Sequence, residues 1–278
     1  MKPGISVCIV VHNEEAIISK VLENIRDIAD EILILHDGPC KDRTLEIAKK
    51  YTRNVFVNKK NAGVPGPIIP QLLRKVKYEW ILKIDADESL SKELKKNIRK
   101  LIQNPEADAY TFKWPTWNGK KYTTRDWPRK LSLYRVSKIS YFGFPHWDEP
   151  KINGKIMQTD FHLEHHPPKY AEDTWHNFVE KGLKRYGRLQ AEYTLKDFKE
   201  FDSFQYPYND FPIQIRIRRD FPLLSAFPFA VLATLKTLFS GGAWKEGKHA
   251  YFEAGTTGIY YLWLGWYIHK LKIKKKLI

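Results

Sequence analysis

Cysteine is scarce in this chain. Only Cys8 and Cys40 occur among its 278 residues, too few for a disulfide framework, and this scarcity favours a reducing compartment. Cys8 lies in an apolar run, where we expect a small core side chain. The amino terminus enters a predicted strand almost at once and has no signal-peptide architecture.

Long uninterrupted apolar segments are also lacking. A transmembrane helix needs about 20 mostly apolar residues. Pro222, Pro228 and Lys236 interrupt the segment 221–239, and the aromatic segment 259–268 is too short. We find no internal repeat and no low-complexity segment. These absences exclude a membrane protein with many spans and a repeat array.

Acidic residues are the minority among the charges. The chain has 47 basic and 32 acidic residues, for a formal charge of +15. Such a surface attracts polyanions, which here means nucleic acid, anionic lipid or nucleotide-bearing substrates. With 43% hydrophobic and 28% charged residues, the composition is that of a globular protein.

Short apolar runs alternate with helical patterns over the first part of the chain. We predict strands at 5–11, 31–35, 54–58 and 80–84, and helices at 16–28, 45–51 and 70–77. This alternation is typical of βαβ units and therefore of a parallel sheet.

The pattern then changes. A helix at 92–102 precedes predicted strands at 109–117, 130–134, 139–144 and 156–163, with a turn at Asn118-Gly119. A further helix is predicted at 170–193. We expect three regions, at 1–104, 105–195 and 196–278, the last of them helical.

An acidic pair, Asp85-x-Asp87, directly follows the predicted strand 80–84. In open α/β sheets, ligands bind at the carboxyl ends of strands. Two carboxylates at such an end suit Mg²⁺ or Mn²⁺, which also bind substrate phosphates. Taken alone, the pair would equally be read as a solvated acidic turn capping the helix that begins near Leu90.

Other polar residues end the neighbouring strands. Asn13-Glu14 follow the first strand, Asp37-Gly38 follow the second, and Asn61-x-Gly63 lie in the loop before the strand at 80–84. With Asp85-x-Asp87, this ordered set resembles the family 2 glycosyltransferases over roughly residues 5–190. The region 126–191 is similar to the branch that acts in lipopolysaccharide-core and surface-glycan assembly, on the segments 130–135, 146–149, 165–166 and 185–191.

The resemblance implies a fold and a donor site. The fold is α/β and GT-A, a Rossmann-like, mostly parallel sheet flanked by helices, here with a C-terminal helical extension. Residues 1–104 would then be the nucleotide-sugar-binding half, 105–195 the acceptor-binding half and 196–278 a helical, membrane-associating region. Asp37 would pair with the uracil of a UDP-sugar, although alone it would be read as a turn residue. The implied donor-binding residues are Val11, Asn13, Glu14, Asp37, Asn61, Gly63, Asp85 and Ala86.

The resemblance also implies a metal site. Asp85 and Asp87 would hold Mg²⁺ or Mn²⁺ against the donor diphosphate, where a Lewis acid stabilises the departing nucleoside diphosphate. His165 and His166 would add a metal or pyrophosphate contact, because imidazole suits Mn²⁺. The alternative is that this histidine pair is part of a loop before Pro167.

An inverting transfer needs a base near the acceptor hydroxyl. The family has an acid shortly after a histidine in this part of the chain, so Asp148 and Glu149 are the candidates. Alignment on Pro150 favours Asp148, but Trp147 is an extra residue between His146 and the acids. The alternative is a surface salt-bridge pair.

These features predict an inverting, metal-dependent enzyme. It would move one sugar from a nucleotide-sugar donor, a UDP-sugar by resemblance, to a glycan or lipid-linked acceptor in cell-surface polysaccharide or glycolipid assembly. The segment 12–15 has no glycine, unlike the phosphate loop of nucleotidyltransferases, and the Gln-x-x-Arg-Trp motif of processive synthases is absent.

The alternative is a non-catalytic, basic membrane-surface or nucleic-acid-binding protein on a degenerate GT-A scaffold. We do not expect nucleic acid, because the first 100 residues lack a basic stripe with interleaved aromatics.

The region 221–278 combines aromatic residues with a lysine cluster at 270–276. This combination suits a helix in the headgroup region of a bilayer. We therefore expect a cytoplasmic protein, peripheral at the inner face of the cell membrane. The alternative is a helical subdomain that packs its aromatics on the core.

Overall fold

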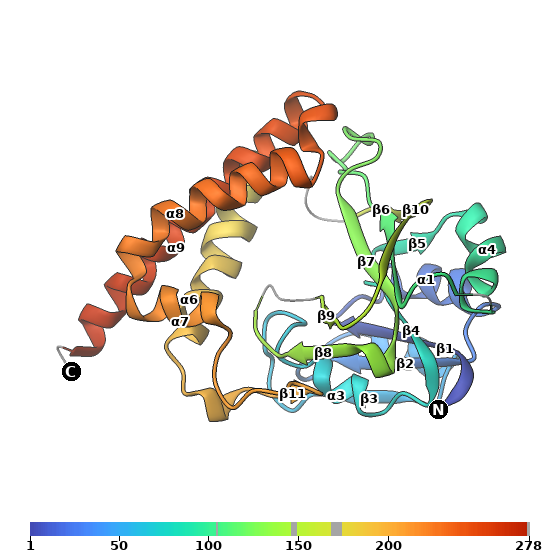
Figure 1. Ribbon diagram of the computed structural model, residues 1–278. Helices are drawn as coiled ribbons and strands as arrows, with labels where there is room; N and C mark the ends of the chain where they lie inside the picture. Colours follow the sequence, from blue (N-terminus) through green and yellow to red (C-terminus); the bar gives the residue numbers. More distant parts are fainter. Residues whose placement is uncertain (104, 146–148, 168–173, 277–278) are drawn as a thin grey trace.

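The computed structural model describes residues 1–103, 105–145, 149–167 and 174–276. A sheet flanked by helices forms one side of the molecule, and the long helices α8 (Pro222–Leu235) and α9 (Lys248–Lys276) form the other (Figure 1). The mixed α/β fold with a mostly parallel sheet predicted from the sequence is confirmed.

The first half of the chain builds the parallel part of the sheet. Its strands and helices are β1 (Lys2–Val11), α1 (Ile18–Ile25), β2 (Glu31–His36), α2 (Thr44–Lys49), β3 (Val55–Val57), α3 (Ile69–Leu73) and β4 (Tyr78–Lys83). Strand β1 pairs in parallel with both β2 and β4, and β2 pairs in parallel with β3. The predicted βαβ pattern is therefore confirmed.

The second half widens the same sheet. Its elements are β5 (Glu88–Leu90), α4 (Lys92–Gln103), β6 (Ala109–Lys113), β7 (Arg129–Arg135), the short helix η1 (Val136–Lys138), β8 (Ile139–Phe142), β9 (Lys151–Ile152) and β10 (Ile156–His165). Over the described residues the eight-stranded order is β3-β2-β1-β4-β7-β6-β10-β5. Strand β7 is antiparallel to both β4 and β6, whereas β10 is parallel to β6.

The apolar run of β1 is buried on both faces of the sheet. Ile5, Val7 and Ile9 point into the layer that contains α1 and α4, while Cys8 packs in the layer that contains α3. Cys8 is thus a core residue, as the sequence predicts, and burial raises the pKa of its thiol.

Three local predictions differ from the structure. Residues 88–90, expected to cap a helix, form β5 because they pair with β10. Helix α3 ends at Leu73 rather than near residue 77. The predicted helix at 170–193 is α5 (Trp175–Asn177), a π-helix η2 (Phe178–Gly187) and α6 (Arg188–Thr194), with 170–173 outside the described residues.

The remaining chain is mainly helical. It comprises η3 (Phe198–Glu200), β11 (Ser203–Phe204), α7 (Ile213–Asp220), α8, η4 (Lys236–Ser240), η5 (Ala243–Lys245) and α9. Strand β11 joins β8 and β9 in a separate three-stranded sheet. Among the described residues, Pro222–Phe239 is the one helical segment whose length and composition would allow it to cross a membrane.

Candidate active site

The carboxyl ends of several strands meet at one edge of the sheet. Strands β2, β1 and β4 are parallel neighbours, so Asp37, Asn13 and Asp85 lie at the same edge. Strand β10 runs in the same direction, because β4 and β6 are both antiparallel to β7 and β10 is parallel to β6. His165, the last residue of β10, therefore also lies at this edge.

Asp37 is buried beneath the Asn61–Gly63 loop. Its Oδ1 accepts hydrogen bonds from the Ala62 N–H (2.8 Å) and the Asn58 amide (3.2 Å), and its Oδ2 accepts one from the Gly63 N–H (2.9 Å). A carboxylate offers about four acceptor positions. The described residues use three of them, so Asp37 holds the loop at 61–63 in place.

Two glycines make this loop contact feasible. Gly38 has a φ of 78°, and a Cβ there would lie 2.9 Å from the Asn61 Cβ. Gly63 has a φ of 79° and donates its N–H to both Asp37 and the Asn61 Oδ1. Side chains are strained in this left-handed region, so the loop at 61–63 depends on glycine at both positions.

The turn after β1 is tied to the turn after β2. Val11 O accepts the Asp37 N–H, while Asn13, with a φ of 54°, donates its N–H to His36 Nε2. The Asn13 Oδ1 accepts from the Lys41 N–H (2.8 Å), and the Glu14 N–H donates to Thr44 Oγ1 (2.6 Å). Hydrogen bonds thus join the turns that carry Asn13, Glu14 and Asp37, and the contact of the predicted donor-binding residues with a nucleotide stays a prediction.

Asp85 does not stand alone at the end of β4. The Lys130 ammonium lies 2.6 Å from Asp85 Oδ2 and 2.6 Å from Glu88 Oε1, and Lys83 Nζ lies 3.9 Å from Asp85 Oδ1. The Trp114 indole also donates to Glu88 Oε1 (2.7 Å). A lysine therefore bridges two carboxylates where the sequence predicts a metal.

Burial and charge act against each other in this cluster. Burial alone would raise the pKa of Asp85, but Lys130 and Lys83 outweigh it and hold that pKa well below its ordinary value. Burial raises the pKa of Glu88, which shares Lys130 with Asp85. Burial alone would lower the pKa of Lys130, but both carboxylates raise it, so the ammonium stays charged.

Asp87 and His165 form the second pair at this edge. The Asp87 Oδ2 lies 3.3 Å from His165 Nε2, and the His165 ring stacks on Trp114 with centroids 4.4 Å apart. Ala86, between the two acids, is buried. The His166 Nε2 lies 3.0 Å from the Tyr122 hydroxyl, while its N–H donates to Asp87 O.

The Asp87–His165 pair fits two adjacent ligand positions of a divalent cation. Octahedral Mg²⁺ has ligands at 2.0–2.1 Å, so adjacent ligand atoms lie about 3 Å apart. Asp85 is engaged by Lys130, and His166 faces Tyr122. Their predicted metal roles therefore stay predictions, and phosphate oxygens and water would complete the shell around Asp87 and His165.

One candidate base, Glu149, lies close to this cluster. The predicted base Asp148 lies outside the described residues. Glu149 is exposed, and its Oε1 accepts the N–H of Leu131, the neighbour of Lys130 in β7 (2.9 Å). Glu149 thus lies beside the start of β7, and its role as a base stays a prediction.

A different group of ligand-type side chains lies after β2. Within the described part of the chain, His36, Cys40 and Asp42 are the one such group whose ligand atoms all lie within 4.8 Å. Both His36 nitrogens are engaged, by Gly38 O and by the Asn13 N–H. Asp42 accepts backbone hydrogen bonds from Thr44 and Glu15. These hydrogen bonds hold the turn after β2 in place, which gives the three side chains a structural role.

Helices η2, α6 and α9 are connected by hydrogen bonds to the Gly63 loop and to Pro145. Arg185 of η2 donates to Gly63 O (3.0 Å), and Gln190 of α6 donates to Pro145 O (3.0 Å). Tyr260 of α9 in turn donates to Gln190 Oε1 (2.8 Å). Helix α9 is therefore linked through α6 to the segment that leads into residues 146–148.

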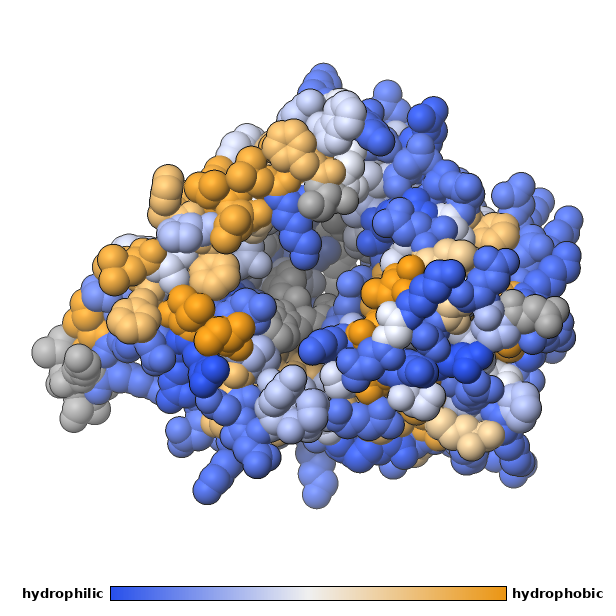
Figure 2. All heavy atoms as spheres, in the orientation of Figure 1, coloured by the Kyte–Doolittle hydropathy of each residue, from blue (hydrophilic) through white to orange (hydrophobic). Residues whose placement is uncertain are grey.

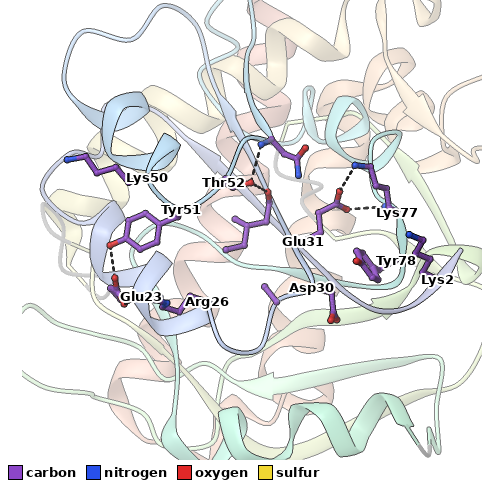
Figure 3. Close-up of a pocket in the computed structure, with 13 residues that line it drawn as sticks. Lys2, Glu23, Arg26, Asp30, Glu31, Lys50, Tyr51, Thr52, Lys77 and Tyr78 are labelled. Atoms are coloured by element: carbon purple, nitrogen blue, oxygen red, sulfur yellow. Dashed lines mark hydrogen bonds and ion pairs between the residues drawn. The ribbon is translucent and has the colours of Figure 1, made fainter.

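A cavity lies at the opposite edge of the sheet. It has a volume of about 780 Å³ and opens at the amino ends of the strands, beside Lys2, Glu31 and Tyr78 (Figure 3). Several of its charges are paired within the chain, such as Lys77 with Glu31. We place the active site at the carboxyl edge, because that edge carries the acids, the imidazole and the glycine loop.

Sequence reasoning missed the pairing of Lys130 with Asp85 and Glu88. Lys130 lies in a segment that carries the family resemblance, but its pairing with Asp85 follows from the register of β4 against β7, in which Leu82 faces Leu133. Two more steps along each strand bring 84 opposite 131, and Lys130 next to Asp85. Had the antiparallel pairing of β4 with β7 been predicted, it would have identified Lys130 as the neighbour of Asp85.

Comparisons with known proteins show which family this chain matches. The family model described as glycosyl transferase family 2 matches residues 6–163. An "uncharacterized glycosyltransferase" of Rickettsia bellii is 34% identical over 106 residues, which are 38% of this chain and 35% of the relative. One from Rickettsia typhi is 32% identical over the same length. The match thus spans about a third of these curated relatives.

Among solved structures, S. aureus TarS 1-349 in complex with UDP-GlcNAc is similar. Its identity is 18% and its TM-score 0.48, over 92% of this chain and 90% of that chain.

Proposed function

Since the chain belongs to glycosyl transferase family 2, we propose that it transfers a single sugar from a nucleotide-sugar donor to a glycan or lipid-linked acceptor. The enzyme would act by inversion with a divalent cation, in the assembly of a cell-surface glycan or glycolipid. One observation carries this proposal. The Asp87–His165 pair lies at the same sheet edge as the Asp37-bound loop.

The donor would lie across the ends of β2, β1 and β4. Two steps between neighbouring strands separate β2 from β4, or about 10 Å. A nucleoside diphosphate can span this distance. The remaining acceptor position of Asp37 would suit a base with an N–H, as in uracil, and the diphosphate would then lie near Asp87.

The charged side chains at this sheet edge would have distinct roles in the transfer. A cation held by Asp87 and His165 would supply Lewis-acid stabilisation to the diphosphate leaving group. Lys130 and Lys83 offset the charge of Asp85 and so reduce its repulsion of the incoming phosphates. Asp148 or Glu149 would take the proton of the acceptor hydroxyl as it attacks the anomeric carbon.

The compartment is part of the proposal. Both cysteines are free thiols, which suits a reducing environment. We therefore propose that transfer takes place on the cytoplasmic side. Family membership and the retained acids favour this enzyme over a non-catalytic basic scaffold.

A thermal-shift screen of nucleotide sugars, with and without Mn²⁺, tests the donor prediction. At a concentration of 100 times its Kd, a ligand stabilises the fold by about 2.7 kcal/mol. In a chain of this size, that is a shift of about 5–10 °C. We expect UDP-sugars to give this shift with Mn²⁺ and less without it. A screen in which no nucleotide sugar shifts the melting temperature would contradict the proposal.

A further inference from the structure

The outward face of helix α8 is apolar along its whole length. Leu224, Phe227 and Leu232 are 77%, 68% and 64% exposed. The other exposed large apolar residues of α8 and η4 are Leu223, Val231, Leu235 and Phe239. These positions recur at helical spacing. Figure 2 shows hydrophobic residues gathered along the α8–α9 hairpin, beside a mostly hydrophilic remainder of this view.

The inward face of α8 carries the small residues instead. Ser225, Ala226 and Ala230 are buried there. Helix α9 approaches closely at two glycines: a Cβ on Gly265 would lie 2.5 Å from the Ala226 Cβ, and one on Gly258 would lie 2.6 Å from Thr234 Oγ1. Small residues between closely packed helices are typical of a lipid environment. A helix on the surface of a water-soluble protein usually turns its large apolar residues toward the core, whereas α8 turns them outward.

Helix α9 repeats the pattern with lysines at its ends. Ile259, Leu262 and Trp266 are exposed in its middle, and the exposed Lys248 and Lys270 flank them at helical spacing. Over residues 221–276 the sequence has eight lysines and two acidic residues. An apolar face bordered by cations is complementary to an anionic lipid surface.

The catalytic part of the chain covers the other side of the hairpin. Tyr260, near the middle of α9, is bound through Gln190 to Pro145. At the hairpin's tip, Glu246 accepts the N–H groups of Arg125 and Asp126 (2.7 and 2.9 Å). A hairpin that crossed a bilayer would carry these polar segments into the hydrocarbon, which is costly. An in-plane orientation leaves them in water.

We propose that the α8–α9 hairpin docks in the plane of an anionic phospholipid bilayer, with the outward face of α8 in the headgroup and acyl boundary. The contacts of Tyr260 and Glu246 then hold the active-site edge in a fixed orientation to the membrane. The inference goes beyond the proposed function, because docking does not require a particular donor or acceptor.

Sedimentation with phosphatidylglycerol–phosphatidylethanolamine vesicles tests the docking. The variant carries Leu224→Glu, Phe227→Glu and Leu232→Glu, and these sites are exposed enough to leave the packing intact. We expect its partition coefficient to fall by about 100-fold or more. The matched control is Ile156→Glu. Ile156 is an apolar residue on β10 that is 49% exposed and lies away from the hairpin. We expect this control variant to bind the vesicles as the wild type does.

Two results would overturn the docking proposal. One is wild-type protein that stays in solution with these vesicles, or a triple variant that binds them as well as wild type does. The other is a wild-type dimer in light scattering that the triple variant converts to a monomer without vesicle binding, which would make a second copy the occupant. A UDP-sugar thermal shift that persists in the triple variant separates this outcome from failure of the donor proposal.

Discussion

Replacing Asp87 by alanine is expected to lower sugar transfer by at least about 100-fold while leaving the fold intact. Asp87 is one of two side chains at the sheet edge whose ligand atoms, 3.3 Å apart, suit adjacent positions on a divalent cation. Its loss removes half of that protein ligand set. The measurement is the release of nucleoside diphosphate from the donor in the presence of acceptor and Mn²⁺.

The matched control is Asp160→Ala. This aspartate belongs to the same strand as His165, but its side chain is 97% exposed and pairs with Lys113. We expect unchanged transfer, because an exposed surface pair contributes little and Lys113 keeps its other partner, Asp126. Full activity of the Asp87→Ala variant would show that Asp87 is not a metal ligand.

The second large effect is on stability. Lys130→Met should lower the free energy of unfolding by about 3–5 kcal/mol, because it leaves two carboxylates without their shared buried cation. The ammonium is 2.6 Å from both Asp85 and Glu88. Urea denaturation measures the loss, with the slope checked for two-state behaviour. Adding Glu88→Gln should recover part of it, since the second charge is then gone.

The control for this experiment is Lys184→Met. Lys184 lies 2.6 Å from Glu180, but this pair is exposed on the surface of η2, and such helical pairs contribute about 0.3–0.5 kcal/mol. If Lys130→Met cost no more than Lys184→Met, the lysine would not be a buried bridge between the carboxylates.

The parallel half of the sheet could be predicted because its signals are local. Strand β1 is buried on both faces, so its apolar run is continuous. Asp37 and Asp85 each follow a strand of this parallel sheet, so the sequence alone predicts that both lie at its carboxyl edge. By contrast, β5 depends on pairing with β10, which is more than 60 residues away in the chain. No local pattern distinguishes it from a helix cap.

The site was predicted less completely than the fold. Resemblance pointed to Asp85 and Asp87 as equivalent ligands, whereas the structure gives them different partners, Lys130 for the first and His165 for the second. That difference comes from the pairing of β7 and β10 with the rest of the sheet. Composition showed that the C-terminal helices are apolar, but not that the large residues of α8 point outward.

Electron paramagnetic resonance of Mn²⁺, titrated into the protein with and without UDP, tests the central claim most directly. We predict one bound ion per chain that appears only with the nucleotide, shows nitrogen coupling from the His165 imidazole, and is lost in Asp87→Ala. Nucleotide binding without any bound Mn²⁺, or a bound ion that survives in Asp87→Ala, would contradict a diphosphate held against a cation at this sheet edge.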